Sequence, residues 1–501
     1  MARRVAWLGV GMAVCFIALF LQLNNIQVAK ASRYANNPNN PAVQTVRFNQ
    51  PRGAIQSSEG VVLAQSTKVP HPCTRCYKYN RSYPTGSLFG HIVGYLSPVY
   101  TVGGVEASYN SYLRAHNRPI KTFGDLLSTP TVTDTITLTV SNRLQAAAQQ
   151  ALAGRDGAIV ALDPSTGAVL AMYSNPTFDP NPLATLTADG SPDVAAEESG
   201  WAQDIAKNQY AFQPLTSNAY QNIFPPGSTF KVLTTAATYD HAPPLVNTPM
   251  PYFNCIAPHY FRGQTTPLCN FGSFGCGGTI AAMLPPSCDT GYAILGTRVG
   301  AAGMTAEADG FGFNQQPRID LPPGPNEVSQ FLQPGCYQNA QVFLAFSSIG
   351  QKCTIASPLQ MAMVAAGIAN GGVVMAPHVM SEIRDQQNNL VKRYLPTPWL
   401  KATTSQTANA VRDLMVRVVQ GGTASGVGFP FQEHVAAKTG TAQTGTAGNG
   451  QTDDWMIAFA PADAPKVALA VVLPHQPRDE TGAVIAGPVM KAMLQATLAG
   501  P

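Results

Sequence analysis

Charged residues are scarce in this sequence. Lys and Arg number 31 and Asp and Glu 27, so 31 + 27 = 58 charged residues make up 12% of the 501 residues. Soluble domains usually carry about 25%. The net charge of +4 is too small to give the dense basic surface that binds nucleic acid. Long coiled coils and charged tails are excluded as well, and we expect no nucleic-acid partner.

Several other features are lacking: the sequence has no internal repeat, no low-complexity tract and only one stretch long enough to cross a membrane. Glycine and proline account for 44 + 41 = 85 residues, too few and too evenly spread for a fibrous or disordered chain. The hydrophobic fraction of 45% is ordinary. The sequence therefore predicts a large folded protein with about two or three domains.

The single long apolar run lies at the N-terminus, over residues 5–23. It contains no charged residue, and Gln22 is its only strongly polar one. As a helix this run spans about 28 Å, close to the thickness of a bilayer core. Because Arg3 and Arg4 precede it, we expect residues 1–4 to stay in the cytoplasm and the rest of the chain to lie outside.

A cleaved signal peptide is the alternative for this segment, with Ala29-Lys30-Ala31 as the cleavage site. The apolar run is longer than the usual core of about 7–15 residues in signal peptides, and the site lies well beyond its end. We therefore predict an uncleaved, single-pass anchor in the plasma membrane, with an extracytoplasmic body.

The nine cysteines fit an external body. Cys15 lies in the apolar run, and eight others follow it: Cys73, Cys76, Cys255, Cys269, Cys276, Cys288, Cys336 and Cys353. This even number predicts disulfides formed in an oxidising compartment, although eight cysteines allow 105 pairings and the sequence does not select one. Cys73-x-x-Cys76 could also be a zinc or redox motif. Since there is no second CxxC pair and no HExxH, we expect no metal and no cofactor.

After the anchor, the chain divides into two parts. Residues 24–130 are polar and interrupted by Gly and Pro, which predicts a small, extended, β-rich module. Residues 131–501 mix helical and strand patterns without regular alternation, so we expect an α+β domain. The patterns predict a helix capped by Ser141 and ended by Gly154, a hairpin over 158–172, a helix from Ser357-Pro358 to Gly371-Gly372, strands over KTGTAQ, DDWMIAFAP and KVALAVVLP, and a closing helix from about Gly487.

The most informative segment is Pro225-Pro226-Gly227-Ser228-Thr229-Phe230-Lys231. Its Pro-Pro-Gly start cannot be helical throughout, but the residues after it can be, so Ser228 is expected at a helix N-terminus. Lys231 then lies on the same face, where an amine with a lowered pKa can act as the base for the serine hydroxyl. The alternative is an ordinary helix cap beside an exposed lysine, and this motif alone does not decide.

Two further motifs follow at wide spacing. Ser287-Cys288-Asp289 comes 59 residues after Ser228, and Lys438-Thr439-Gly440-Thr441 comes another 151 residues later. Ser-x-x-Lys, then Ser-x-Asn, then Lys-Thr-Gly in this order is the signature of penicillin-recognising serine enzymes. The sequence has no G-x-S-x-G, which would indicate a different class of serine enzyme.

The residues of the third motif, together with Ser228, can each have a distinct physical role in such an enzyme. Lys438 can attract a substrate carboxylate and, as a fixed cation, favour the neutral form of Lys231. Gly440 leaves room for an extended peptide to pair with the strand. The backbone N–H groups of Ser228 and Thr441 can stabilise the developing oxyanion.

With these motifs, the chain resembles a class B penicillin-binding protein, most similar in type to the short penicillin-binding protein A group of actinobacteria. The resemblance covers nearly all of the external chain and includes Arg52-Gly53-Ala54-Ile55, Gly104-Val105-Glu106 with Tyr109-Asn110, Asp163-Pro164 with Thr166-Gly167-Ala168, Pro358-Leu359-Gln360-Met361-Ala362, and Trp455 with Phe459-Ala460-Pro461. It implies a pedestal of the dimerisation type over 24–130. It also implies a transpeptidase domain, an antiparallel sheet with an α-helical subdomain, over 131–501.

The resemblance further implies a peptidoglycan D,D-transpeptidase that acts through a Ser228 acyl-enzyme and is trapped by β-lactams. Lys231 would accept the serine proton, Ser287 would relay a proton to the leaving amine, and an amine of a neighbouring stem peptide would complete the cross-link. The implied catalytic residues are Ser228, Lys231, Ser287 and Lys438, and the substrate-binding residues are Asp289, Thr439, Gly440 and Thr441. No glycosyltransferase-sized region precedes the pedestal, so we expect a separate glycosyltransferase from the cell-division or elongation machinery.

Asp289 departs from the family pattern, which has Asn at this position. A carboxamide both donates and accepts hydrogen bonds, whereas an ionised Asp only accepts and would favour the charged form of Lys231. A catalytically weakened scaffold or antibiotic sensor is therefore one alternative. The others are a D,D-carboxypeptidase or β-lactamase, and an unrelated surface-binding protein with chance motifs.

Overall fold

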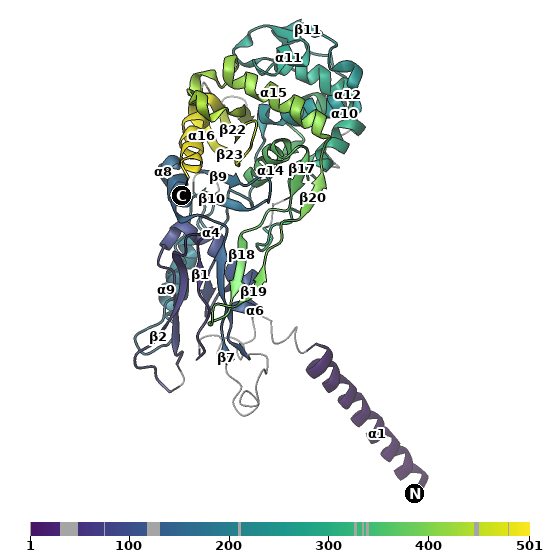
Figure 1. Ribbon diagram of the computed structural model, residues 1–501. Coiled ribbons are helices and arrows are strands. Elements are labelled where there is room, and N and C mark those ends of the chain that lie inside the picture. Colours follow the sequence, from purple (N-terminus) through teal and green to yellow (C-terminus); the bar gives the residue numbers. More distant parts are fainter. Residues whose placement is uncertain are drawn as a thin grey trace.

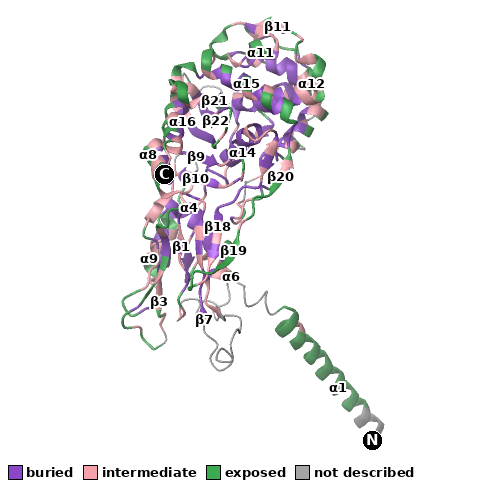
Figure 2. Ribbon diagram, viewed as in Figure 1, coloured by how far each residue is buried: buried purple, intermediate pink, exposed green. Residues whose placement is uncertain are grey.

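The computed structural model describes residues 2–30, 49–74, 76–117, 131–208, 212–324, 328–332, 335–336, 340–444, 450–478 and 480–500. Helix α1 (Ala2–Asn24) covers the predicted anchor and continues into a π-helical turn, Asn25–Ala29. Within the described residues, Gly9–Ala29 is the one helical stretch long and apolar enough to cross a membrane. Its exposed apolar side chains contrast with the buried core of the body in Figure 2.

A six-stranded sheet forms the lower part of the body in Figure 1, in the order β19-β18-β8-β1-β2-β3. The strands are β1 (Ile55–Gln56), β2 (Val62–Lys68), β3 (Tyr79–Ser82), β8 (Thr135–Leu138), β18 (Met380–Arg384) and β19 (Leu390–Arg393). β1 and β8 are parallel, and the other neighbours are antiparallel. Strands from both sides of the expected boundary at residue 131 share this sheet, because the β18–β19 hairpin returns to it from far along the chain.

A buried ionic cluster lies beside this sheet. The Arg52 and Arg81 guanidinium groups contact the two oxygens of the Glu106 carboxylate at 2.5 and 2.6 Å. Arg52 also donates to Asn110 Oδ1 at 2.7 Å, and Arg81 donates to the Gly53 carbonyl at 2.8 Å. The R-G-x-I and G-V-E segments of the sequence are therefore joined through one network of charge-assisted hydrogen bonds.

A second, five-stranded sheet lies above the first. Its strands run antiparallel in the order β10-β9-β23-β22-β21, with bounds β9 (Gly157–Leu162), β10 (Val169–Asn175), β21 (Ala436–Thr444), β22 (Gln451–Ala460) and β23 (Val467–Pro477). In β9, Ala158, Val160 and Leu162 face one core, while Ile159 and Ala161 face the other. Burial on both faces explains the nearly continuous apolar runs of these strands.

Helices cover both faces of this sheet. α14 (Pro358–Ala369) packs on one face, and α8 (Asn142–Leu152) and α16 (Gly482–Leu498) pack on the other. The predicted positions of α8 and α14 are confirmed. The start predicted for α16 near Gly487 is wrong: the helix begins at Gly482, where a side chain would collide with the Gly440 and Trp455 carbonyls, and it accommodates Pro488.

A helical subdomain completes the body at the end opposite β2 (Figure 1). It contains α10 (Lys231–His241), α11 (Ile280–Met283), α12 (Asp289–Gly310), α13 (Gln341–Ser347) and α15 (Ser405–Gly421). Shorter helices are α4 (Gly90–Val93), α5 (Gly104–Ser108), α6 (Asn110–Leu113) and α9 (Val194–Asp204). Two-stranded pairs are β4 (Leu96–Ser97) with β5 (Thr101–Val102), β6 (His116–Asn117) with β7 (Thr131–Val132), β11 (Met250–Phe253) with β14 (Cys276–Gly278), β12 (Cys255–Ile256) with β13 (Leu268–Cys269), β15 (Gln330–Phe331) with β16 (Thr354–Ile355), and β17 (Val373–Met375) with β20 (Pro398–Lys401).

Four disulfides join the eight cysteines that follow the anchor, as the even count predicted. The pairs are Cys73–Cys76, Cys255–Cys269, Cys276–Cys288 and Cys336–Cys353. Asp189 lies close to the first pair. Because the two sulfurs of that CxxC are bonded to each other, neither is a free thiolate ligand for a metal in this state.

Candidate active site

Ser228 lies in a tight turn that leads into a helix, as the sequence predicted. The turn is the 3-10 helix η4 (Gly227–Phe230), and α10 follows it directly. Gly227 has a φ of +52°, which disfavours a side chain. The Thr229 hydroxyl donates to the Pro226 carbonyl at 2.6 Å, and the Phe230 ring stacks on Phe331 with centroids 5.1 Å apart. These contacts fix the turn that carries the Ser228 hydroxyl.

Lys231 is fully buried one turn further along. Its ammonium nitrogen donates to Asp289 Oδ1 at 2.7 Å, to the Ser287 carbonyl at 2.7 Å and to Ser287 Oγ at 3.3 Å. It also lies 5.6 Å from the centre of the Tyr292 ring. Desolvation lowers the pKa of Lys231, and the Asp289 carboxylate opposes that shift. The expected proximity of Asp289 to this lysine is confirmed.

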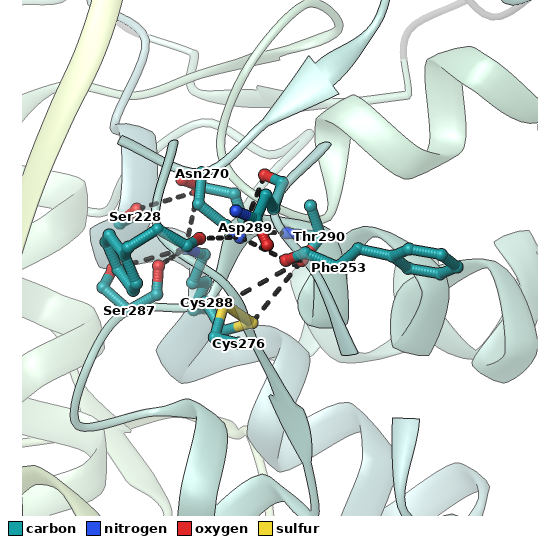
Figure 3. The surroundings of a disulfide bond; sticks show 11 residues. Ser228, Phe253, Asn270, Cys276, Ser287, Cys288, Asp289 and Thr290 are labelled. Atoms are coloured by element: carbon teal, nitrogen blue, oxygen red, sulfur yellow. Dashed lines mark hydrogen bonds and ion pairs between the residues drawn. A yellow bond between two sulfur atoms is a disulfide. The ribbon is translucent and has the colours of Figure 1, made fainter. Parts of the chain in front are cut away.

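The second motif forms a strained turn at the start of α12. Ser287 has a φ of +62°, a conformation that few non-glycine residues adopt. Cys288 is bonded to Cys276 on β14, and the Asn270 side chain accepts a hydrogen bond from the Thr290 N–H at 3.0 Å (Figure 3). Both attachments hold the turn against the neighbouring loop. The sequence motifs gave no reason to select Asn270 or Thr290, because their role depends on contacts between distant segments.

Lys438 reaches the same cluster from β21. Its nitrogen donates to Ser287 Oγ at 2.8 Å and to the Thr439 carbonyl at 2.9 Å. Desolvation and the nearby Lys231 charge hold the pKa of Lys438 well below its usual value. Ser287 Oγ therefore bridges the two lysine side chains, which brings all three motifs into one hydrogen-bonded cluster.

The glycine of the third motif has a packing role that the sequence analysis did not predict. A side chain at Gly440 would lie 2.8 Å from the Pro226 carbonyl oxygen and 2.9 Å from the Thr229 methyl group. Gly440 therefore lets β21 approach the turn that carries Ser228. β21 is also the edge strand of the five-stranded sheet, so its outer edge has the geometry to which an extended peptide can add.

The two threonines that flank Gly440 are also held in place. Thr439 Oγ1 lies 2.6 Å from Thr423 Oγ1, and Thr441 Oγ1 accepts a hydrogen bond from the Gly482 N–H at 3.0 Å. The strand is thus tied to the loop before it and to the first residue of α16.

The hydrogen bond of Ser228 differs from the one that the Ser-x-x-Lys pattern suggested. Ser228 Oγ donates to Asp289 Oδ1 at 3.4 Å, as Figure 3 shows. Ser228 and Lys231 both belong to the described part of the chain, and no hydrogen bond joins them there. Asp289 consequently contacts both the serine and its neighbouring lysine.

Two family descriptions match the chain. "Penicillin binding protein A dimerisation domain" matches residues 52–130, and "Penicillin binding protein transpeptidase domain" matches residues 157–495. The chain belongs to the class B penicillin-binding proteins. The α+β fold with a dimerisation domain and a transpeptidase domain, predicted from the motifs, is confirmed.

Members of this family from mycobacteria are similar to the chain over almost its whole length. The peptidoglycan D,D-transpeptidase PbpA of Mycobacterium tuberculosis is 32% identical over 97% of this chain and 96% of its own. PbpA of Mycolicibacterium smegmatis is 32% identical over 99% and 98%. The structure of M. tuberculosis penicillin-binding protein A as a ceftriaxone acyl-enzyme complex matches with a TM-score of 0.78 and 30% identity, over 90% of this chain and 99% of that one.

Proposed function

We propose that Ser228 is the nucleophile of this class B penicillin-binding protein, which is a serine-type peptidoglycan D,D-transpeptidase. The observation that carries the proposal is the hydrogen-bonded cluster of Ser228, Lys231, Ser287 and Lys438 around Asp289. A group of this kind supplies a nucleophile, proton carriers and a cation for a substrate carboxylate.

The proposed reaction has two stages. Ser228 Oγ attacks the carbonyl carbon of the penultimate D-Ala of a stem peptide, and the terminal D-Ala leaves as an amine. An amine from a neighbouring stem peptide then attacks the acyl-enzyme and releases the serine. Lys438 and Thr439 are proposed to bind the terminal carboxylate, and the Ser228 and Thr441 N–H groups are proposed to bind the oxyanion.

A β-lactam would enter the same reaction, because its strained amide is opened by Ser228 and leaves a stable acyl-enzyme. The acyl-enzyme complexes of the M. tuberculosis relative support this step. They also favour an active enzyme over the disabled scaffold that Asp289 suggested as an alternative.

The N-terminal helix and the disulfides support the proposed cellular placement. α1 would anchor the chain, residues 1–4 would lie in the cytoplasm, and the body would face the cell wall outside the membrane. Four disulfides fit such an oxidising location. The glycan strands that this enzyme cross-links would be made by a separate glycosyltransferase of the division or elongation machinery.

The test is labelling of the full-length, detergent-solubilised protein with a fluorescent penicillin, beside the variant Ser228→Ala. We expect one label per chain in the wild type and none in the variant. Label that persists in Ser228→Ala would refute the nucleophile assignment. Incubation with a D-Ala-D-Ala stem peptide and an amine acceptor then separates the alternatives, because a carboxypeptidase or β-lactamase would give hydrolysis without transfer.

A further inference from the structure

The exposed aromatic side chains of the body gather in one segment, residues 250–278, which we call the aromatic module. Among the described residues that follow the anchor, five aromatic side chains are exposed, and four of them belong to this module. Their exposed fractions are 72% for Tyr252, 47% for Tyr260, 46% for Phe271 and 42% for Phe274. Single exposed rings are common on protein surfaces, but a concentration of this kind indicates a binding surface.

A disulfide and one buried side chain hold the aromatic module in shape. The Cys255–Cys269 disulfide closes it internally, across β12 and β13. The buried Asn270 side chain donates to the carbonyls of Phe253 and Phe274 at 2.8 and 2.9 Å. A ligand that binds these rings therefore meets a surface that is already ordered, which lowers the entropy cost of binding.

The aromatic module is joined directly to the second motif of the active site. Asn270 Oδ1 accepts a hydrogen bond from the N–H of Thr290, the residue after Asp289, at 3.0 Å (Figure 3). The Asp289 carboxylate in turn accepts a hydrogen bond from the Ser228 hydroxyl. The exposed Phe271 follows Asn270 in the chain. The Phe271 end of the aromatic module therefore lies close to the proposed nucleophile.

Two of the exposed rings come from different segments of the module and lie within one residue of each other. A side chain at Gly275 would lie 2.3 Å from Cε1 of Tyr252, so the Tyr252 ring lies against Gly275. Phe274 is the residue before Gly275, and Tyr252 belongs to β11, which pairs with β14. The absence of a side chain at Gly275 thus allows the Tyr252 ring to lie next to Phe274.

The aromatic module carries almost no charge. Arg262 is its single Lys, Arg, Asp or Glu residue. The substrate has two chemically different parts: stem peptides, which carry free carboxylates and an amine, and β-1,4-linked N-acetylhexosamine strands, whose sugar rings are uncharged. The module offers little to pair with the charges of a stem peptide. The electron-rich face of an aromatic ring does attract the C–H groups on one face of a sugar ring. The composition of the module therefore fits the glycan strand.

We infer that the aromatic module binds the glycan strand of peptidoglycan, with Tyr252 and Phe274 as the rings on which the sugars stack. This inference rests on the proposed function, because it takes the substrate to be a stem peptide still attached to its glycan strand. An extended stem peptide of five residues spans at most about 17 Å. The contact between Asn270 and Thr290 places the start of the module within this reach of Ser228, so one substrate can occupy both sites.

The test is isothermal titration calorimetry with the β-1,4-linked hexamer of N-acetylglucosamine, an uncharged probe for the glycan strand. The full-length protein is held in a detergent without a sugar head group, and its active site is first blocked with unlabelled penicillin. We expect the hexamer to bind with a Kd of about 1 mM or tighter. A D-Ala-D-Ala stem peptide without sugar should not bind the blocked protein. Absence of hexamer binding, or binding of the stem peptide instead, would overturn the inference.

Variants separate ring stacking from general apolar contact. Tyr252→Ala and Phe274→Ala should each raise the Kd of the hexamer by about 3–10-fold. Tyr252→Phe keeps the ring and should bind like the wild type, whereas Tyr252→Leu keeps apolar bulk without a ring and should bind like Tyr252→Ala. The matched control is Phe431→Ala, because Phe431 is 93% exposed and lies outside the module. Its Kd should equal that of the wild type.

Contrary outcomes are kept separate by these controls. A Tyr252→Leu variant that binds as well as the wild type, or an equal loss in Phe431→Ala, would overturn the inference. Thermal unfolding of each variant establishes that it is folded, and if the alanine variants do not fold, the comparison of Tyr252→Phe with Tyr252→Leu decides. A wild type that penicillin does not label would instead refute Ser228 as the nucleophile, and titration of the unblocked protein would still test the module.

Discussion

Two buried clusters in this protein each combine one carboxylate with two basic side chains, but they differ in whether the basic groups can lose a proton. In the pedestal, Arg52 and Arg81 surround Glu106, and in the active site Lys231 and Lys438 lie around Asp289. Each cluster has two basic side chains and one carboxylate. A guanidinium remains protonated at any physiological pH and binds a carboxylate through several fixed donors, whereas a lysine amine can lose its proton.

The pKa directions follow this difference. Burial alone would raise the pKa of Glu106, but the two arginines outweigh it and lower the pKa. In the active site, desolvation lowers the pKa of both lysines. Glu106 is sealed from solvent, and Asp289 is partly open. The pedestal cluster is therefore fixed in charge and stabilises the fold, while the active-site cluster can exchange protons, as its proposed role in catalysis requires.

The largest expected effect comes from breaking the active-site cluster with Lys231→Met. This change removes the amine that the Ser-x-x-Lys motif offers as a base and leaves Asp289 without its ion pair. Acylation by fluorescent penicillin should therefore slow by about 10²–10⁴-fold. The control is Lys466→Met, since this lysine is exposed and directly precedes β23. A loss of less than about tenfold in Lys231→Met would show that the buried lysine is not part of the proton path.

Breaking the pedestal cluster should affect stability and leave the chemistry unchanged. Glu106→Gln keeps the shape of the side chain but leaves two buried arginines without a counter-charge. The free energy of unfolding should fall by about 3–5 kcal/mol, measured by urea denaturation. The folded fraction should be acylated at the wild-type rate.

A surface cluster provides the matched control for Glu106. Glu382 pairs with Arg384 and Arg393, and those arginines are much more exposed than Arg52 and Arg81. Glu382→Gln should lower the free energy of unfolding by less than about 1 kcal/mol. Equal losses in the two variants would contradict the distinction between a sealed and an exposed cluster.

The disulfides allow a sharper test of how the active-site cluster is positioned. Cys276–Cys288 and Cys255–Cys269 close loops of similar length, with sequence separations of 12 and 14. Replacing either pair with serines should lower the free energy of unfolding by about 3 kcal/mol. Only loss of Cys276–Cys288 should also slow acylation, because Cys288 lies between Ser287 and Asp289. Equal acylation rates in both double variants would exclude a positioning role for this disulfide.

The elements that short-range patterns determine could be predicted from the sequence. Ser141 Oγ accepts a hydrogen bond from the Leu144 N–H, and Ser357 Oγ from the Gln360 N–H, so both helices begin at the predicted caps. The three motifs that meet in the candidate active site were also selected from their order and residue types. In each case the physical cause acts within a few residues or requires a specific side chain.

The features that could not be predicted from the sequence depend on contacts between segments far apart in the chain. β18 completes the pedestal sheet because Met380 pairs with Leu138, and no local pattern indicates that partner. The packing role of Gly440 depends on the carbonyl of Pro226. The same holds for the acceptor of the Ser228 hydroxyl, since the family pattern pointed to Lys231 and the structure joins Ser228 to Asp289.

The smallest expected loss of stability concerns a third carboxylate, that of the exposed Glu59 in the pedestal. It accepts hydrogen bonds from Ser141 Oγ and, at 2.9 Å, from the Asn142 N–H at the start of α8. Burial works against ionisation here, but these bonds lower the pKa of Glu59 to about 2. Its stabilising effect is therefore present above its usual pKa and is lost as the pH falls towards 2.

Glu59→Gln is the variant that measures this effect. At neutral pH it should lower the free energy of unfolding by about 0.5–1 kcal/mol, the usual value for an exposed helix cap. Because glutamine does not titrate, the difference between wild type and variant should shrink as the pH is lowered below the usual pKa of Glu59. A difference that stays constant down to acid pH would show that the Glu59 side chain stabilises the fold without its charge.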